Sequence, residues 1–258
     1  MIAAVALFAK NWDGHVDDAE QVARGGGFQA MRERILELAR PGADEVVVDF
    51  GAGTGLLALA LPGRVHSVWA IDSSPAMVEY LRAKAEKSEL MNLSCVHASV
   101  TSVPLVDGVA DLVVSNYCCH ELNDQDKTAA LCEAFRLLRP GGRLVIGDMM
   151  FTLDPSCKRN RRIVCAKIRA LARRGVPGIV RLAKNALRIM TGSWEHPASA
   201  AWWRGALERA GFEEITIELC SHEGGIASAS RRVSEPTVTL APLAASPDTA
   251  AERLAALA

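Results

Sequence analysis

The chain has 258 residues, 50% of them hydrophobic and 23% charged, and its formal net charge at pH 7 is −1. This length and composition allow one well-packed soluble domain, and the near-zero charge gives no general reason to expect nucleic-acid or membrane binding. Seven cysteines without CxxC or His/Cys spacing favour reduced thiols in the cytoplasm over disulfides or a zinc site. The apolar start MIAAVALFAK lacks a basic leading segment, and no apolar run has the length of a membrane span, so we expect neither a signal peptide nor stable membrane insertion.

Strands and helices alternate along the chain. Hydrophobic patterning predicts strands near residues 45–50, 67–72, 93–98, 110–116, 143–149, 213–219 and 225–231. It predicts helices near residues 17–40, 54–61, 75–88, 126–138 and 199–210. Ser74 and Pro75 are typical of a helix start, and Pro140 with the two glycines after it is typical of a helix end. The alternation predicts an α/β fold with a doubly wound, mostly parallel sheet.

The stretch VVVDFGAGTG, residues 46–55, predicts a buried strand that ends in a glycine-rich turn. Its glycines allow a sharp turn and a close approach of the backbone to a ligand, and the leucines that follow predict a helix whose free N–H groups face the turn. A dinucleotide fingerprint would need its third glycine at Leu56, so the spacing here is GxGxG. Asp49 precedes the turn and no Lys or Arg lies near it, which favours a ligand whose nearest part is cationic or zwitterionic.

The next strand, SVWAID, ends in Asp72, 21 positions after Gly51, where an acid can accept hydrogen bonds from both hydroxyls of a ribose. Together these features resemble the class I S-adenosylmethionine-dependent methyltransferases. VVDFGAGTGLLAL is similar to the first motif of that family, AIDSSPAMVEYLRAKA to its second strand and helix, and VADLVVSNYCCHEL to its fourth motif. FRLLRPGGRLVIGD is similar to its fifth strand, WWRGALERAGFEEITIEL to its late helix and sixth strand, and GGIASASRR to its seventh strand.

The resemblance implies a seven-stranded sheet in the order 3-2-1-4-5-7-6, with the last strand antiparallel. It also implies a division of the chain into four parts. These are an N-terminal helical cap (1–41), a methyltransferase core (42–150 and 199–232), a basic helical lid insertion (151–198) and an Ala/Pro-rich C-terminal tail (233–258), which we expect to form a loop and one peripheral helix.

The resemblance further implies S-adenosylmethionine as cofactor and a small-molecule acceptor. The positions that match the cofactor-binding motifs of the family are Asp49, Gly51, Ala52, Gly53, Gly55, Asp72, Ser73, Ser99, Val100 and Asn116. Many relatives carry an acid against the adenine amine where this chain has Ser99, whose hydroxyl can still accept that hydrogen bond. The expected substrate contacts are Trp12, His15, Tyr117 and Glu121.

The N-terminal segment, residues 9–31, carries three aromatic or imidazole side chains beside four acids (Trp12, His15 and Phe28; Asp13, Asp17, Asp18 and Glu20). In resembling enzymes such a segment covers the methionine end of the cofactor and forms one wall of the substrate cavity. The alternative is a capped amphipathic helix whose acids are solvated near its positive end.

The insertion carries strong local charge, because residues 151–190 hold eleven Lys and Arg residues against the single acid Asp154, a net charge of +10. Apolar residues recur near helical spacing on both sides of an RRGVPG break, which predicts two basic amphipathic helices and a mobile lid. Three functions stay open: a funnel for an anionic or polyhydroxylated substrate, a membrane-surface helix pair that admits a lipid or quinone, and RNA binding, although the stretch lacks aromatics for base stacking. The arginines could also simply be a solvated face that pairs with the acidic N-terminal segment.

The segment SNYCCHELND follows the fourth strand and faces the reactive methyl group in resembling enzymes. His120 lies where many small-molecule members have a histidine, and a base with a near-neutral pKa suits a hydroxyl nucleophile. Asn116 and Tyr117 do not recreate the NPPY-type motif of amide or adenine N-methyltransferases. We therefore predict O-methylation of a hydroxylated metabolite, for example an anionic or sugar-like one, with His120 as general base.

Several alternatives remain at this stage. A C-methyltransferase of a membrane-associated quinone or lipid is the closest, followed by a nucleotide-binding module without catalysis; the GxGxG spacing disfavours an NAD-dependent oxidoreductase. Four side chains, His120, Glu121, Asp124 and Asp148, could instead bind magnesium and a substrate diol. The vicinal Cys118 and Cys119 suggest arsenite chemistry but suit small packing residues better. The sequence leaves the acceptor and the oligomeric state open.

Overall fold

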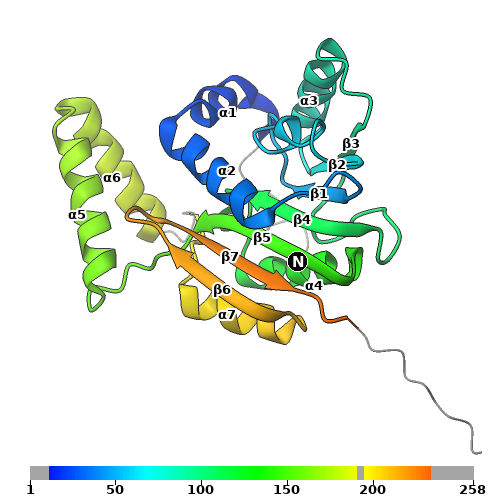
Figure 1. Ribbon diagram of the computed structural model, residues 1–258. Coiled ribbons are helices and arrows are strands. Elements are labelled where there is room, and N and C mark those ends of the chain that lie inside the picture. Colours follow the sequence, from blue (N-terminus) through cyan, green and yellow to red (C-terminus); the bar gives the residue numbers. More distant parts are fainter. Residues whose placement is uncertain (1–11, 191–194, 234–258) are drawn as a thin grey trace, which may run out of the picture.

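A seven-stranded sheet forms the centre of the computed structural model, which describes residues 12–190 and 195–233 (Figure 1). The strands follow the order β3-β2-β1-β4-β5-β7-β6, and β7 runs antiparallel to both β5 and β6 whereas the other neighbours are parallel. The predicted fold class and strand order are therefore confirmed. The bounds are β1 Val46–Phe50, β2 Ser67–Asp72, β3 Leu93–His97, β4 Ala110–Asn116, β5 Leu138–Met149, β6 Glu213–Leu219 and β7 Gly224–Ser230.

Helices cover both faces of the sheet (Figure 1). On one face, α2 and α3 pack with the turn after β1 against a cluster that includes Ile35, Leu61 and Leu81; on the other, α4 and α7 pack against a cluster that includes Leu131 and Trp203. The helix bounds are α1 Val16–Ala23, α2 Gly26–Ala39, α3 Pro75–Lys87, α4 Asp124–Leu137, α5 Lys158–Ala172, α6 Val176–Met190 and α7 Ala200–Arg209. Three 3₁₀ turns are η1 Trp12–Gly14, η2 Ala58–Ala60 and η3 Cys119–Glu121.

The central strands are buried on both faces, as parallel strands between two helical layers must be. Val47, Val48 and Phe50 of β1 are almost fully buried, and Asp49 is buried among them at 1% exposure. A carboxyl group at this depth adds nothing to apolar packing, so it points to a functional position.

Two predicted helices differ from the structure. The helix expected over 17–40 is divided at Gly25, which takes an extended conformation and begins α2, because a run of three glycines has little helix propensity. The helix expected over 54–61 is wrong, since only the 3₁₀ turn η2 forms there. Gly55 at its start and Pro62 at its end leave too few residues for a stable helix nucleus.

The insertion forms the two predicted basic helices, α5 and α6, which pack side by side and stand away from the sheet (Figure 1). They leave the sheet where β5 ends, which is the carboxyl edge of the parallel strands. In the described part of the chain, none of the helices is both long and apolar enough to cross a bilayer. Most of the expected C-terminal tail lies outside the described residues.

Candidate active site

The glycine turn after β1 is held by three residues with positive φ, Gly51 at 67°, Gly53 at 51° and Gly55 at 94°. They differ in what surrounds them. A Cβ on Gly51 would overlap Cys118 and one on Gly55 would overlap Leu81, whereas a Cβ on Gly53 would meet nothing within 4 Å. Gly51 and Gly55 are therefore required by packing, and Gly53 is the position where the backbone faces open space that a ligand can enter.

Replacing Gly51 with alanine should lower the free energy of unfolding by at least about 2 kcal/mol, because the new Cβ meets the Cys118 side chain at a backbone conformation that alanine rarely adopts. Urea denaturation measures the change. Gly63→Ala is the matched control, since Gly63 has open space and no positive φ, and it should leave stability nearly unchanged. Equal stability of the two variants would contradict the packing at Gly51.

Asp72, at the end of β2, faces the glycine turn. Its Oδ2 accepts a hydrogen bond from the Gly53 N–H at 2.7 Å and its Oδ1 accepts one from the Ser74 N–H at 2.9 Å. Burial raises the pKa of Asp72, opposed by these backbone donors. Each carboxylate oxygen keeps a further lone pair, so the group is oriented by the backbone and can still accept from ribose hydroxyls.

Two polar side chains beside the turn have buried atoms without a hydrogen-bond partner. Asp49 Oδ2 and both amide atoms of Asn116 have no hydrogen-bond partner among the described residues. Asp49 is paired in register with Val114 of β4, and Asn116 ends that strand. Burial raises the pKa of Asp49 to about 8, opposed by the Ala58 N–H and reinforced by the nearby Asp72. Such groups are rare without a partner, and the amine and carboxylate of a methionine moiety would supply complementary charges and hydrogen bonds.

The predicted adenine side lies at the ends of β2 and β3. The Ala98 N–H donates to the Asp72 carbonyl at 3.0 Å, so Ser99 and Val100 follow directly at the same edge. The Ser99 hydroxyl bonds with the Thr101 hydroxyl at 2.7 Å, and Val100 is buried. The carbonyl of the residue after Asp72, Ser73, accepts a hydrogen bond from the His97 ring at 3.1 Å.

The N-terminal segment packs on the start of α3. The Ser74 hydroxyl donates to Asp13 Oδ1 at 2.5 Å, so η1 sits next to Asp72. The rings of Trp12 and His15 lie edge to face, with 6.4 Å between their centroids. This arrangement puts the two expected substrate contacts, Trp12 and His15, near the start of α3 and Asp72.

The acids of that segment have local partners. Asp18 pairs with His15 at 3.3 Å, and Glu20 pairs with Arg24 at 3.2 Å and with Lys84 at 3.0 Å. Asp18 and Glu20 therefore pair with these neighbours and not with the arginines of the insertion, as the alternative interpretation of the sequence had expected.

Tyr117 begins the loop after β4 in a left-handed conformation, with φ at 54°. Its ring packs against Phe28 of α2 at 4.6 Å and lies edge to face with His120 at 6.0 Å. Burial is the main cause that raises the pKa of the Tyr117 hydroxyl, so the phenol stays neutral. The structure thus brings Tyr117 and Glu121 together around His120, and Trp12 and His15 together at η1.

His120 is oriented by Asp148, which the sequence grouped with it only as a candidate magnesium ligand. His120 Nδ1 and Asp148 Oδ1 are hydrogen-bonded at 2.8 Å. The backbone N–H of His120 also donates to Asp148 Oδ2 at 3.1 Å. Asp148 is fully buried near the end of β5 and also accepts the Met149 N–H at 2.6 Å. His120 Nε2 lies 3.7 Å from Glu121 Oε1.

The charges around His120 decide its protonation. Burial lowers its pKa, but the carboxylates of Asp148, Glu121 and Glu195 together outweigh burial and raise it above the ordinary value. With the carboxylate accepting the Nδ1 hydrogen, Nε2 is the nitrogen that can take a proton from a substrate. A buried His–Asp pair of this kind is an arrangement suited to general-base chemistry.

The magnesium alternative has no support in the described part of the chain, where no three His, Cys, Asp or Glu side chains form a group that could hold a metal ion. Asp124, one of the proposed ligands, instead pairs with the buried Lys127 at 3.3 Å. Cys118 is packed behind Gly51 and Cys119 is buried in the core, which fits the packing role rather than arsenite chemistry.

A cavity of about 560 Å³ borders the His120 region. Its wall joins the segment after β5 to the segment before α7, which is tied to the histidine because the His196 N–H donates to the His120 carbonyl at 2.7 Å. The lining residues are Asp124, Thr152, Leu153, Glu195, His196 and Pro197. Leu153 and Pro197 give this lining an apolar part, and the other four residues carry polar side chains.

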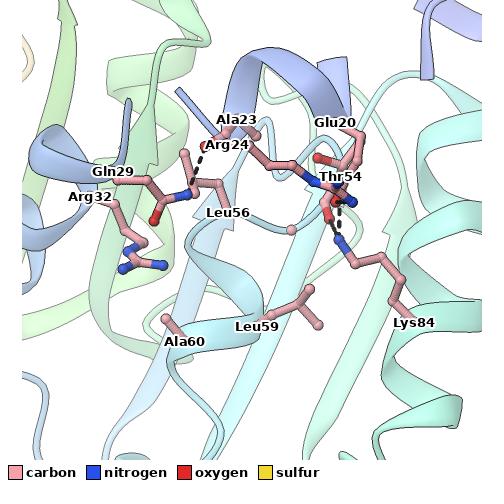
Figure 2. Close-up of a pocket in the computed structure, with 11 residues that line it drawn as sticks. Glu20, Ala23, Arg24, Gln29, Arg32, Thr54, Leu56, Leu59, Ala60 and Lys84 are labelled. Carbon is pink, nitrogen blue, oxygen red and sulfur yellow. Dashed lines mark hydrogen bonds and ion pairs between the residues drawn. The ribbon is translucent and has the colours of Figure 1, made fainter. Parts of the chain in front are cut away.

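A smaller cavity of about 230 Å³ lies on the helical side of the glycine turn, between the turn and α1 and α2 (Figure 2). At one end Lys84 Nζ donates to Glu20 at 3.0 Å and to the Thr54 carbonyl at 3.0 Å, while Gln29 and Arg32 lie at the other end. Lys84 therefore fixes the N-terminal cap and the glycine turn to one another.

Comparison with known proteins agrees with this geometry. Residues 47–142 match a family model described as a methyltransferase domain. The chain is 35% identical over 127 residues to a malonyl-[acyl-carrier protein] O-methyltransferase of Hahella chejuensis, covering 48% of this chain and 44% of that one. It is 35% identical over 123 residues to a demethylmenaquinone methyltransferase of Thermus thermophilus, covering 47% and 54%.

Among solved structures, an S-adenosylmethionine-dependent methyltransferase from Aquifex aeolicus shares the fold, with a TM-score of 0.60 and 19% identity over 84% of this chain and 98% of that one. The chain spans about half the length of these two curated relatives.

Proposed function

We propose that this chain, which is similar to S-adenosylmethionine-dependent methyltransferases in residues 47–142 and in its fold, methylates an oxygen of a hydroxylated small molecule, with His120 as the general base. The observation that carries this proposal is the 2.8 Å contact between His120 and the buried Asp148 at the edge of the sheet where the glycine turn also lies. A sheet edge at which the strand order reverses is the usual ligand site of a doubly wound fold.

The residues around the turn fit the cofactor. S-adenosylmethionine, when bound, supplies an electrophilic methyl group on its sulfonium sulfur. Asp72 would accept the ribose hydroxyls, Gly53 leaves room for the ligand at the backbone, and Asp49 and Asn116 would pair with the amine and carboxylate of the methionine part. Calorimetry can measure the cofactor affinity of variants at these residues, and it needs no knowledge of the acceptor.

For the acceptor, the chain provides a base and a polar cavity. Asp148 holds the His120 ring so that Nε2 can take the proton of an acceptor hydroxyl as the new bond to carbon forms. The cavity beside it is lined by Asp124 and Glu195, so carboxylates would accept hydrogen bonds from further hydroxyls and would repel an acidic acceptor. A neutral, polyhydroxylated acceptor fits this lining better than an anionic one.

Cofactor binding should release protons near pH 7. The pKa of Asp49 is raised to about 8 in the free protein, so its carboxyl is mostly protonated there, and a bound ammonium would favour the ionised form and expel the proton. Calorimetry at pH 7 in buffers of different ionisation enthalpy measures the release. Asp49→Asn should bind without it; equal proton release by wild type and variant would contradict this role of Asp49.

C-methylation of a membrane-associated quinone is the second candidate. The exposed basic and apolar helices at the same edge of the sheet favour it, and one relative is named a demethylmenaquinone methyltransferase. Identifying the methylated product by mass spectrometry separates the two, because fragmentation distinguishes a methyl ether or ester from a methyl group on carbon.

A further inference from the structure

Helix α6 presents an apolar stripe to solvent. Val176, Ile179, Val180 and Met190 are 74%, 59%, 48% and 83% exposed. Their spacing puts them on one side of an α-helix, whereas Gly178, which packs against the Leu171 backbone, marks the side that faces α5. The stripe is therefore not the surface that α6 uses to pack on α5.

A row of cations runs along the stripe. Arg181 and Lys184 lie one turn apart on the adjacent face of α6 and are both exposed. No acid occurs between residues 155 and 190, in a chain whose overall net charge is −1. Unpartnered apolar side chains bordered by cations, with no acid in either helix, are complementary to a surface that is both anionic and apolar beneath.

The base of this helix pair is fixed to the sheet. Arg159 of α5 donates to the backbone carbonyls of Met150, His222 and Gly224 at 2.6–2.9 Å, and Lys167 pairs with Glu223 at 2.7 Å. These contacts join α5 to the start of β7 and the end of β5. The anchored helix α5 thus holds α6 at the carboxyl edge of the sheet, the edge of the candidate active site (Figure 1).

We propose that the outer face of α6 docks the protein on the surface of an anionic lipid bilayer. A helix of 15 residues can lie in the headgroup region with its apolar stripe in the acyl boundary and its cations against lipid phosphates. Two other partners fit less well. A second copy of the chain would bring the same cations together, and nucleic acid would leave the aliphatic stripe exposed without any aromatic side chain in residues 158–190 for base stacking.

Docking would bring the candidate active site close to the membrane, whatever the methyl acceptor is. It does not depend on methyl transfer, so binding can be measured without cofactor or acceptor. An acceptor taken from the bilayer would support C-methylation of a quinone, the second candidate function. Failure of either proposal, docking or C-methylation, would leave the other standing.

Cosedimentation of the full chain with sucrose-loaded vesicles tests the proposal. The probe is phosphatidylcholine alone or with a quarter of phosphatidylglycerol, at low and high salt. Two variants change the docking face, Ile179→Gln with Val180→Gln for the stripe and Arg181→Glu with Lys184→Glu for the charge. Met91→Gln and Lys87→Glu change an exposed apolar residue and an exposed cation elsewhere and serve as controls.

Wild type and both controls should bind the anionic vesicles and lose binding at high salt, whereas each docking variant should bind at least about 10-fold more weakly. Circular dichroism checks that all variants fold. Equal binding by wild type and both docking variants, or no binding to anionic vesicles, would overturn the proposal. Concentration-dependent dimers lost in the stripe variant would assign the face to self-association instead, and salt-sensitive binding to RNA but not to vesicles would assign it to nucleic acid.

Discussion

Replacing His120 with alanine should lower turnover by about 10²–10⁴-fold and leave the affinity for S-adenosylmethionine nearly unchanged. A hydroxyl is far too weak an acid to ionise beforehand at neutral pH, so the loss of a positioned base slows the step in which the proton leaves. Single-turnover kinetics with an identified acceptor measure the rate, and calorimetry measures cofactor affinity. His66→Ala replaces an exposed histidine and is the matched control.

The pH dependence gives a second readout of the same pair. A base acts in its neutral form, so the rate should fall as pH drops through the pKa of His120, and because Asp148 and its neighbours raise that pKa, the fall should be centred above the ordinary histidine value. Asp148→Asn removes the nearest charge and should move the fall to lower pH. Near-full single-turnover activity in His120→Ala would contradict the base role and leave alignment alone as the source of the rate.

Replacing Asp72 with alanine should weaken S-adenosylmethionine binding by roughly 10- to 150-fold per lost hydrogen bond, because each charge-assisted bond to a ribose hydroxyl contributes about 1.5–3 kcal/mol. Gly53→Val should weaken it by a comparable factor by filling the open space that the ligand would occupy. Titration calorimetry measures both affinities.

The controls separate binding from folding. Asp44→Ala removes an exposed acid before β1, and Gly63→Val adds a side chain at another glycine with open space; both should keep the affinity of wild type. Because Gly53 has a positive φ of 51°, valine is strained there, so urea unfolding of Gly53→Val must show a folded protein before its affinity is compared. Unchanged affinity in both Asp72→Ala and Gly53→Val would exclude the glycine turn as the cofactor site.

The sheet could be predicted from sequence because its strands are short, contiguous apolar runs between helical segments. Val46–Phe50 and Ala110–Asn116 are almost entirely buried, and burial on two faces leaves the same apolar signature whatever the neighbours are. The turn at residues 54–61 has the same leucine-rich composition as a helix, and composition alone did not reveal that Gly55 and Pro62 leave too few residues between them for a stable helix.

The sequence grouped His120 with Asp148 only as candidate magnesium ligands, and their hydrogen bond could not be predicted because it depends on pairing between strands. Asn116 of β4 is in register with Gly147 of β5, which places Asp148, the next residue of β5, near the loop that carries His120. A usable signal existed, since both follow buried strands at the same sheet edge. The different environments of the three glycines could not be predicted either, because Cys118 reaches Gly51 from another loop.

We expect methyl transfer from S-adenosylmethionine at the edge that holds Gly53, Asp72 and His120. The most direct measurement incubates the protein with methyl-labelled S-adenosylmethionine and fractionated cell metabolites, with and without lipid, and follows S-adenosylhomocysteine and labelled products by mass spectrometry. Wild type should form S-adenosylhomocysteine in equal amount to one labelled product, His120→Ala should form both far more slowly, and Asp72→Ala should need more cofactor. Tight cofactor binding by wild type without S-adenosylhomocysteine in any fraction would contradict the account and indicate a binding module.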